Sequence, residues 1–406
     1  FWVTFMTENA QKGAVSAIEI PMLGWVAKDT TSVSFPIAKF GGQKVTDQGR
    51  AAGNGIRPDG SEIPPPPPET TSIKSTPEMQ AKYVKAIKAL ATKLKAKGPR
   101  IYMLDNEPAL WNSTHRDVHP EPVSYDELMK LTKEYAAVVR DNDPEGLIAG
   151  PTAYGWMEYN FSAKDAKAGA HLKPDRRAHD DLPLLAWYLR ELKAHEQKTG
   201  KKLLDLLDVH FYPQAEGVGL SKEGKTDMTT SAIRMRSPRA LWDPTYVDES
   251  WIKEAQNLIP RLRGWIDQYY PGIDIQIGEW NYGAEVDISG GLATAETLGR
   301  FADPVLSSML RYGDLDVIGT FDFVLQAVGS GYYFNQIQFA AGVTRQEIQV
   351  PLVDNAFPNP RVHFTARLQQ PGGGAVIGDI QEATVVIADD ESGMGAGVAW
   401  MRAKAR

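Results

Sequence analysis

The chain has 406 residues, of which 42% are hydrophobic and 23% are charged, as is usual for a globular protein. Its net charge at pH 7 is −7 and no basic run is present, which argues against nucleic acid as a partner, and no apolar stretch is long enough to span a membrane. Cysteine is absent, so disulfides and thiolate metal sites are excluded.

Residues 1–14 open the chain with amphipathic helical periodicity, and they lack the basic start and the small-residue cleavage site of a signal peptide. Short apolar runs then alternate with helical patterns along most of the sequence. Six of these runs are predicted strands, at residues 18–26, 100–106, 147–154, 203–212, 273–282 and 315–323. Helical periodicity is clearest over residues 77–98, 124–144, 181–200 and 248–272.

This alternation of strand and helix predicts a parallel sheet, and strands that are apolar on both faces predict that helices cover it. A closed barrel of this class needs eight strands, whereas six strand–helix units are present. We therefore expect an α/β domain over residues 1–328, a TIM-like (β/α)8 barrel whose first two strands are missing.

Two regions depart from the alternation. Residues 29–77 are rich in Gly and Pro and include a polyproline II segment at 64–68, which predicts a long loop that is either functional or disordered. From about residue 331 the pattern alternates between apolar and polar residues, with turn signals at short spacing. This pattern predicts an all-β, sandwich-like segment over residues 329–406.

The reacting groups of parallel barrels lie at the C-terminal ends of the strands. Two glutamates occupy such positions here, Glu107 in LDNEPALW and Glu279 in GEWNYG, and Pro108 interrupts strand pairing directly after Glu107. Glycoside hydrolysis requires such a pair, because one carboxyl group protonates the leaving oxygen while the other attacks the anomeric carbon or activates water. The strand ends also carry polar and aromatic candidates for sugar binding, namely Trp25, Asn106, Trp111, Trp156, His210, Tyr212, Trp280 and Tyr282.

Several longer segments resemble glycoside hydrolase family 44, a family of retaining endo-β-1,4-glucanases and xyloglucanases. They include GWVAKD, GNGIRPDG, LDNEPALWNSTHRDVHPEPVSYDEL, LLDLLDVHFYPQAEG and GEWNYGAEVDISGGLATAETLG, and the resemblance runs from about residue 10 to residue 323. It implies a TIM-like barrel with an attached β-sandwich. It also implies Glu107 as the acid/base, Glu279 as the nucleophile, Asn106 as a ligand of the hydroxyl beside the attacked carbon, and Tyr212 as a partner of the nucleophile.

The sequence departs from the family pattern at both ends. The first two strands of the family, with their Arg-Trp-Gly-Gly-Asn segment, are missing, and so is the family's closing sandwich. Residues 333–392 resemble instead the later half of a Calx-beta domain, a module that binds calcium through acidic loops. Asp389, Asp390 and Glu391 are the acidic residues that remain there.

No cofactor is expected for catalysis. The family binds calcium near its barrel, so a structural calcium ion is an expectation.

His115 and His119 stand four residues apart, as zinc ligands on a helix do, but the glutamate of the H-E-x-x-H motif is missing. His210, Trp25 and Trp156 could equally be core residues that support the site.

The expected partners are β-1,4-glucan polysaccharides such as xyloglucan and soluble cellulose derivatives, with no role for nucleic acid or a membrane. Such polymers are too large to enter cells, so a secreted, extracellular protein is expected. Two alternatives stay open. One is a non-catalytic β-glucan binder, if the missing strands keep the glutamates apart, and the other is a different retaining barrel hydrolase such as a xylanase or mannanase.

Overall fold

The computed structural model describes residues 1–12, 16–219, 224–284, 287–301, 306–309, 362–367 and 382–387. The chain divides into two compact units. The first comprises Phe1–Tyr212, Gln256–Trp280 and Pro304–Arg311, and the remaining segments belong to the second. The predicted domain boundary between residues 328 and 329 lies outside the described residues and stays a prediction.

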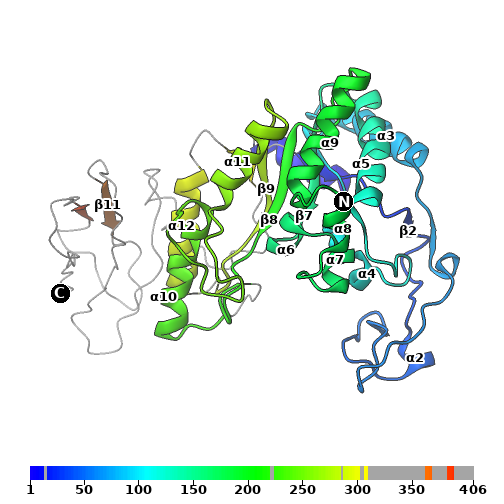
Figure 1. The fold of residues 1–406 in the computed structure, drawn as a ribbon, viewed down its shortest axis with the longest axis horizontal. Helices are drawn as coiled ribbons and strands as arrows, with labels where there is room; N and C mark the ends of the chain where they lie inside the picture. The colour runs from blue at the N-terminus through cyan, green and yellow to red at the C-terminus, as the bar shows by residue number, and fades with distance from the viewer. Residues whose placement is uncertain are drawn as a thin grey trace, which may run out of the picture. The chain divides into compact units, whose positions relative to one another are not determined.

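A six-stranded sheet forms the centre of the first unit, in the order β1-β6-β7-β8-β9-β10. Figure 1 shows β7, β8 and β9 of this sheet side by side. Every neighbouring pair in this sheet is parallel, which confirms the predicted parallel architecture of a (β/α) barrel. β1 and β10 form the two edges of this sheet. The strands are β1 (Ala17–Glu19), β6 (Ile101–Met103), β7 (Leu147–Ala153), β8 (Leu206–Phe211), β9 (Asp274–Trp280) and β10 (Leu306–Met309).

The first predicted strand differs from the one observed, and the last lies outside the described residues. The run at residues 18–26 is divided, because only β1 joins the sheet, whereas β2 (Trp25–Ala27) leaves it to pair antiparallel with β5 (Ser72–Lys74). The sixth strand of the sheet is β10, which lies before the predicted strand at residues 315–323, and that stretch falls outside the described residues.

The expected helices are α1 (Trp2–Lys12), α3 (Pro77–Leu94), α5 (Tyr125–Asn142), α9 (Leu184–Thr199) and α11 (Leu258–Tyr269). α3 packs against α5, α5 against α9 and α9 against α11, so successive helices cover the sheet side by side (Figure 1). The helix predicted over 248–272 begins only at Leu258, because Asn257 has a left-handed backbone (φ 43°). Pro260 then falls in the first turn, where its missing N–H removes no helical hydrogen bond.

The sheet has an outer face toward the helices and an inner face. On the outer face, the Tyr102 hydroxyl donates to Asp143 at the end of α5 at 2.7 Å. On the inner face, Ile101, Ala149 and Leu206 from three neighbouring strands form a buried apolar cluster. Parallel pairing places Ile101 beside Leu147 and Ala149 beside Leu206, which gives the inner face a continuous apolar floor.

The Gly- and Pro-rich residues 29–77 are folded rather than extended. They contain α2 (Ile37–Phe40), β3 (Thr46–Asp47) paired with β4 (Ala52–Gly53), and the 3-10 turn η1 (Pro68–Thr70). Arg116, which follows β6 in the chain, is buried and donates to the carbonyls of Gly55 and Ile63, and its guanidinium lies 4.8 Å from the Phe35 ring centroid. This one side chain ties the inserted segment to the segment that carries Glu107.

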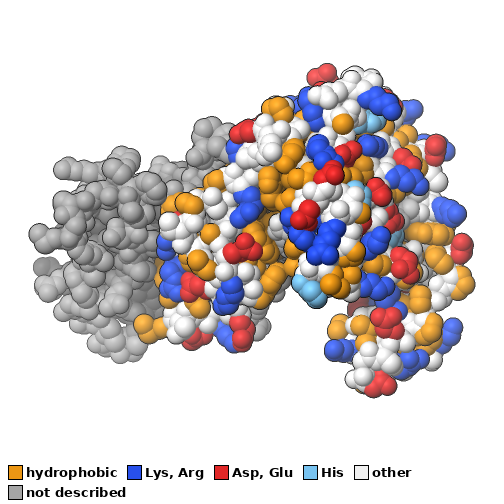
Figure 2. Space-filling model, in the orientation of Figure 1, with side chains coloured by type: hydrophobic (Ala, Val, Ile, Leu, Met, Phe, Trp, Pro, Cys, Tyr) orange, Lys and Arg blue, Asp and Glu red, His pale blue; other side chains and the backbone are white. Residues whose placement is uncertain are grey.

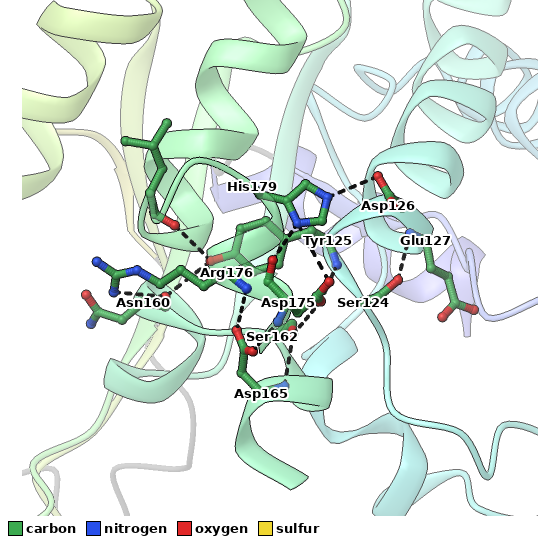
Figure 3. A network of polar contacts seen from close by, with 11 residues as sticks. Ser124, Tyr125, Asp126, Glu127, Asn160, Ser162, Asp165, Asp175, Arg176 and His179 are labelled. Carbon is green, nitrogen blue, oxygen red and sulfur yellow. Dashed lines mark hydrogen bonds and ion pairs between the residues drawn. The ribbon is translucent and has the colours of Figure 1, made fainter. Parts of the chain in front are cut away.

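Short helices follow the strand ends: η2 (Pro108–Leu110), α4 (Trp111–Thr114), α6 (Trp156–Asn160), α7 (Ala163–Ala168) and α8 (Pro174–Ala178). A polar network joins α5, α7 and α8 (Figure 3). In it, Asp175 accepts hydrogen bonds from the Tyr125 N–H and the Ser162 hydroxyl, and Asp165 accepts from the N–H groups of Asp175 and Arg176. Both carboxylates are buried and take backbone donors that would otherwise lack partners.

The second unit contains α10 (Met228–Arg236), η3 (Ser237–Leu241), α12 (Ile288–Phe301) and the antiparallel pair β11 (Val362–Arg367) and β12 (Glu382–Ile387). Arg234 is fully buried and donates to the carbonyls of Gly217, Lys225 and Tyr282 and to the Ser289 hydroxyl, so it joins α10 to the start of α12. The β11–β12 pair agrees with the all-β pattern predicted there, whereas the Calx-beta resemblance stays a prediction.

Acidic and basic side chains are interspersed over the face drawn in Figure 2, and no basic region dominates it. None of the described helices combines the length and the apolar character that crossing a membrane requires. The face drawn in Figure 2 therefore gives no indication of a nucleic-acid partner.

We predict that Ser124→Ala lowers the free energy of unfolding by about 1 kcal/mol, because the Ser124 hydroxyl caps α5 by accepting the Glu127 N–H at 3.2 Å. Denaturant unfolding measures the effect. Lys130→Ala, at an exposed position of the same helix, is the control and should change stability by less than about 0.5 kcal/mol. Equal effects of the two substitutions would contradict the capping role.

Candidate active site

Glu107, His210, Tyr212 and Glu279 meet at the C-terminal ends of β6, β8 and β9. His210 Nδ1 lies 2.9 Å from Glu107 Oε1 and 3.6 Å from Glu279 Oε2, and the Tyr212 hydroxyl donates to Glu279 Oε2 at 2.6 Å. Oxygens of the two carboxylates and the His210 nitrogen all lie within 4.8 Å of one another. His210 is buried, whereas the Glu107 and Glu279 side chains keep 22% and 25% of their surface exposed, so a substrate can reach both carboxylates.

A register shift between β8 and β9 brings Glu279 to this group. Asp208 pairs with Gln276 and Val209 with Ile277, but His210 pairs with Glu279, so Gly278 is passed over. Side chains alternate along a strand, and neighbours in a parallel pair point to the same face. Without the shift, Glu279 would share the outer face with Ile277, whereas with it Glu279 joins His210 on the inner face.

Gly278 permits this shift because Asp208 fills the space beside it. A Cβ atom at position 278 would lie 2.5 Å from Asp208 Oδ1, which is closer than nonbonded atoms approach. Asp208 is fully buried and lies on β8 two residues before His210, on the same face of the strand. It accepts a hydrogen bond from the Thr152 hydroxyl at 3.2 Å. Burial raises the pKa of Asp208 to about 7, while the positive charge of His210 opposes the rise.

Three non-glycine residues near the site have left-handed backbones: Asp105 (φ 63°), Glu107 (φ 46°) and Thr152 (φ 60°). This conformation costs of order 1–3 kcal/mol for each residue and persists only where the surroundings hold it. The Glu107 N–H donates to the Thr152 carbonyl at 3.1 Å, and Asp105 accepts the N–H groups of Leu23 and Asn106, each at 2.8 Å. These bonds connect the ends of β1, β6 and β7.

The charge of His210 depends on the carboxylates around it. Burial alone would lower its pKa, but the hydrogen bond to Glu107 and the negative charges of Glu279 and Asp208 outweigh burial and raise the pKa of His210 above its ordinary value. A protonated His210 between Glu107 and Glu279 reduces the repulsion between the two carboxylates.

Most of the predicted aromatic sugar contacts have buried rings, whereas a stacking platform exposes a ring face, so their role as platforms stays a prediction. Trp111, Trp280 and Tyr282 are each 1% exposed and Trp156 is 9% exposed. The Trp111 N–H donates to the Asn106 carbonyl at 3.0 Å, so this indole supports the strand end instead. Tyr282 accepts a hydrogen bond from Thr297 at 2.5 Å within the second unit, and the Arg261 guanidinium lies 5.1 Å from the Trp156 ring centroid.

The other predicted residues keep access to solvent or to the site. Trp25 is half-buried, and the Lys74 ammonium lies 5.7 Å from its ring centroid. The Asn106 side chain is half-buried next to Glu107, as a ligand of a sugar hydroxyl would be. Their roles as sugar contacts stay predictions.

A zinc site at His115 and His119 is not formed by the part of the chain that the structure describes. His119 Nε2 contacts Glu127 at 3.0 Å, and His115 Nδ1 contacts Thr114 at 2.9 Å. Among the described residues, the one group whose geometry could hold a metal ion is Glu107, His210 and Glu279. These are also the groups that the two-carboxylate chemistry requires.

Sequence reasoning missed three acidic residues of this region, Asp105, Glu158 and Asp208. Asp208 had a detectable signal, because Asp208, His210 and Tyr212 stand at every second position of one strand and must share a face. Glu158 had none, because it lies on the five-residue helix α6 and reaches the site only through tertiary structure.

Comparisons with known proteins point to one family. The sequence model of glycoside hydrolase family 44 matches residues 3–215. A β-mannanase/endoglucanase A of Caldicellulosiruptor saccharolyticus is 37% identical over 235 residues, and an endoglucanase A of Paenibacillus lautus is 40% identical over 210 residues. These alignments cover 53% and 50% of this chain, but only 17% and 29% of the two relatives, so the chain spans a minor part of their length.

Solved structures resemble the fold over almost the whole chain. CelM2, a bifunctional glucanase-xylanase from a metagenome library, superimposes with a TM-score of 0.75 at 28% identity, covering 95% of this chain and 82% of CelM2. A family 44 xyloglucanase of Paenibacillus polymyxa gives a TM-score of 0.61 at 24% identity. The match covers 99% of this chain and 81% of the xyloglucanase, and at this identity it supports a similar fold only. The CelM2 likeness supports a (β/α)8-barrel architecture for the first unit.

We predict that Gly278→Ala lowers kcat/KM by at least about 100-fold, because the added Cβ must displace Asp208 or undo the register shift, and small displacements of a reacting group have effects of this size. The matched control is Gly264→Ala in α11, where nothing lies within 4 Å of the added Cβ. That variant should keep its activity and be equally or more stable. Similar losses in both variants would contradict the role of Gly278.

We predict that Asp208 makes the protein less stable as the pH rises from about 4 to about 7. The folded state retains the Asp208 proton up to about pH 7, whereas the unfolded state releases it near pH 4. The folded state therefore binds more protons in this window, and its stability falls as the pH rises. His210, whose pKa is also raised, contributes stability below about pH 6.5 that is lost at higher pH, so it acts in the same direction.

Denaturant unfolding of the wild type and Asp208→Asn at several pH values measures this contribution. The difference in unfolding free energy between the two should change with pH between about 4 and 7, with the wild type losing more stability. A difference that is constant across the window would show that Asp208 does not hold a proton in the folded state.

Proposed function

The chain belongs to glycoside hydrolase family 44, and from this premise we propose that its first unit is the barrel of a retaining endo-β-1,4-glucanase. The observation that carries the proposal is the short separation of Glu107 and Glu279, since one oxygen of each carboxylate lies within 4.8 Å of one of the other. Retaining glycosidases place their carboxyl groups about 5–5.5 Å apart, whereas inverting enzymes leave about 6.5–9.5 Å for a water molecule. The spacing here supports direct attack on the sugar.

In the first step, Glu279 attacks the anomeric carbon and Glu107 gives its proton to the glycosidic oxygen as the bond between that oxygen and the carbon breaks. The product is an ester between Glu279 and the sugar. We assign the nucleophile to Glu279 because the Tyr212 hydroxyl donates to it at 2.6 Å, and a donor stabilises the ionised carboxylate. His210 contacts both carboxylates and can stabilise whichever of them is negative.

In the second step, Glu107 accepts a proton from water, and the water oxygen bonds to the anomeric carbon. The ester bond breaks, and the Glu279 carboxylate is regenerated. Two inversions at one carbon restore its original configuration. The scheme uses these side chains and water, so it requires no cofactor.

The proposed substrates are β-1,4-glucan polysaccharides, including xyloglucan and soluble cellulose derivatives. Their support is the similarity to proteins named endoglucanase and to a Paenibacillus polymyxa xyloglucanase solved with xyloglucan. Trp25 and Asn106 are the proposed sugar contacts that remain half-exposed near the strand ends. We also propose that the protein acts outside the cell, because these polymers are too large to enter it.

We predict that a 2-deoxy-2-fluoro cello-oligosaccharide with an activated leaving group labels Glu279. The fluorine slows both steps, and the good leaving group lets the first proceed, so the ester accumulates. Mass spectrometry of proteolytic fragments locates the label. Tyr212→Phe should be labelled more slowly, because it lacks the donor to Glu279.

A label on any residue other than Glu279 would refute the proposed nucleophile. Xyloglucan incubated with the protein should also yield new reducing ends. Binding of xyloglucan without new reducing ends would favour a non-catalytic glucan binder instead. If reducing sugar is released faster from xylan or mannan than from xyloglucan, the protein is a xylanase or mannanase instead.

A further inference from the structure

Glu158 is a buried carboxyl group beside the proposed acid/base, and the reaction scheme does not use it. It lies on α6, directly after β7, and only 1% of its surface is exposed. Its Oε1 accepts the Ala109 N–H at 3.1 Å, and its Oε2 accepts the Tyr154 N–H at 2.8 Å. The two oxygens therefore bridge the turn after Glu107 and the end of β7.

The bridge acts on a backbone that needs support. Glu107 has a left-handed conformation (φ 46°, ψ 60°), and the turn η2 begins at the next residue with Pro108. One bond already joins this turn to β7, from the Glu107 N–H to the Thr152 carbonyl. The Ala109–Glu158 bond is a second connection, on the other side of Glu107, so Glu107 lies between two attachments to the same strand end.

The helix that presents Glu158 is itself anchored. Tyr159, its neighbour on α6, donates from its hydroxyl to the His210 carbonyl on β8. α6 also packs against α9, the long helix on the outer face of the sheet. Glu158 therefore links the turn that carries Glu107 to the ends of β7 and β8.

We propose that Glu158 is a positioning residue for Glu107, and that its bridge between Ala109 and Tyr154 holds the Glu107 carboxyl where it can protonate the leaving oxygen. This inference rests on the proposed function, since it assumes that Glu107 is the acid/base. Glu158 does not touch the substrate in this scheme.

The electrostatics of Glu158 agree with this role. Burial raises its pKa to about 8, although the two N–H bonds oppose the rise, and the negative charge of Glu107 adds to it. Glu158 therefore remains mostly protonated at neutral pH. In that form its carbonyl oxygen accepts one N–H group and its hydroxyl oxygen accepts the other more weakly, and no second full negative charge stands beside Glu107.

The test compares Glu158→Gln with the wild type on two substrates that differ in leaving group. Glutamine offers one oxygen acceptor, and its amide N–H2 faces the second backbone donor, so one arm of the bridge is lost. Cellotetraose has a poor leaving group that needs a proton, whereas 2,4-dinitrophenyl β-cellobioside has one that departs without it. The measurement is kcat/KM, because this ratio reports the first step for both substrates.

We predict that Glu158→Gln lowers kcat/KM for cellotetraose by at least about tenfold and for the dinitrophenyl glycoside by less than about threefold, because general acid catalysis contributes about 10²–10⁴-fold only where a proton is needed. Glu158→Asp, which withdraws the carboxyl by one methylene, is a second variant and should show the same selective loss. Equal losses on both substrates, or no loss on either, would overturn the proposal.

Asp165→Asn is the matched control. Asp165 is fully buried and lies in the network that joins α7 and α8 (Figure 3). Its carboxylate accepts two backbone N–H bonds, from Asp175 and Arg176, which belong to that network and not to the site of Glu107. Its substitution should reduce stability while leaving the ratio of the two kcat/KM values unchanged. If the ratio of the two kcat/KM values also changes in Asp165→Asn, the effect of Glu158→Gln results from a general loss of structure and the positioning role is wrong.

Glu107→Ala, measured with the same two substrates, separates this inference from the proposed function. It should lose activity on cellotetraose far more than on the dinitrophenyl glycoside. If Glu107→Ala shows this selectivity and folded Glu158→Gln does not, the positioning role fails while the proposed function stands. If Glu107→Ala shows no selectivity, Glu107 is not the acid/base, and the proposed function is contradicted independently of Glu158.

Discussion

Parallel pairing of neighbouring strands is the constraint on which the site depends. Because every strand in the sheet runs the same way, the ends of β6, β8 and β9 meet at one edge, although Glu107 and Glu279 are more than 170 residues apart in the chain. Pairing alone would leave Glu279 on the outer face, among helices. The register shift at Gly278 turns it inward, and Asp208 occupies the space that a larger side chain would need. One glycine and one buried acid thus help to bring Glu279 beside Glu107 in the proposed catalytic pair.

The inner face concentrates carboxyl groups in an environment that disfavours their charge. An isolated buried carboxylate is strongly destabilising, so each one must find donors, a positive partner or a proton. Glu107 and Glu279 remain partly exposed and share His210. Asp208 and Glu158 lie deeper, and burial raises the pKa of each, to about 7 and about 8. The two carboxylates of the proposed reaction therefore lie near solvent, while burial opposes the ionisation of the two acids behind them.

Much of this site could be predicted from sequence, because strand-end positions and short motifs carry local information. Glu107, His210, Tyr212 and Glu279 follow apolar runs, and the structure brings them together. Burial of the indoles could not be predicted in this way, because whether a ring covers the core or faces a sugar depends on neighbours distant in sequence. Trp111 shows this difference, since it directly follows the Glu107 turn and yet lies in the interior. The Gly278 shift escapes pattern analysis for a related reason, because an alternating pattern assumes an unbroken register.

Backbone strain around Glu107 connects the stability of this protein to its chemistry. Asp105, Glu107 and Thr152 adopt left-handed conformations that extended strands do not favour, and Thr152 is β-branched, for which this conformation is especially unfavourable. Such conformations persist only where other bonds hold them, and here those bonds come from the Asp105 carboxylate, the Thr152 carbonyl and the Glu158 carboxyl. Relaxing the strain would stabilise the chain locally but release the turn that presents Glu107. The buried acids are therefore best understood as supports, whose unfavourable burial is offset by the fixed geometry that they give to two partly exposed carboxylates.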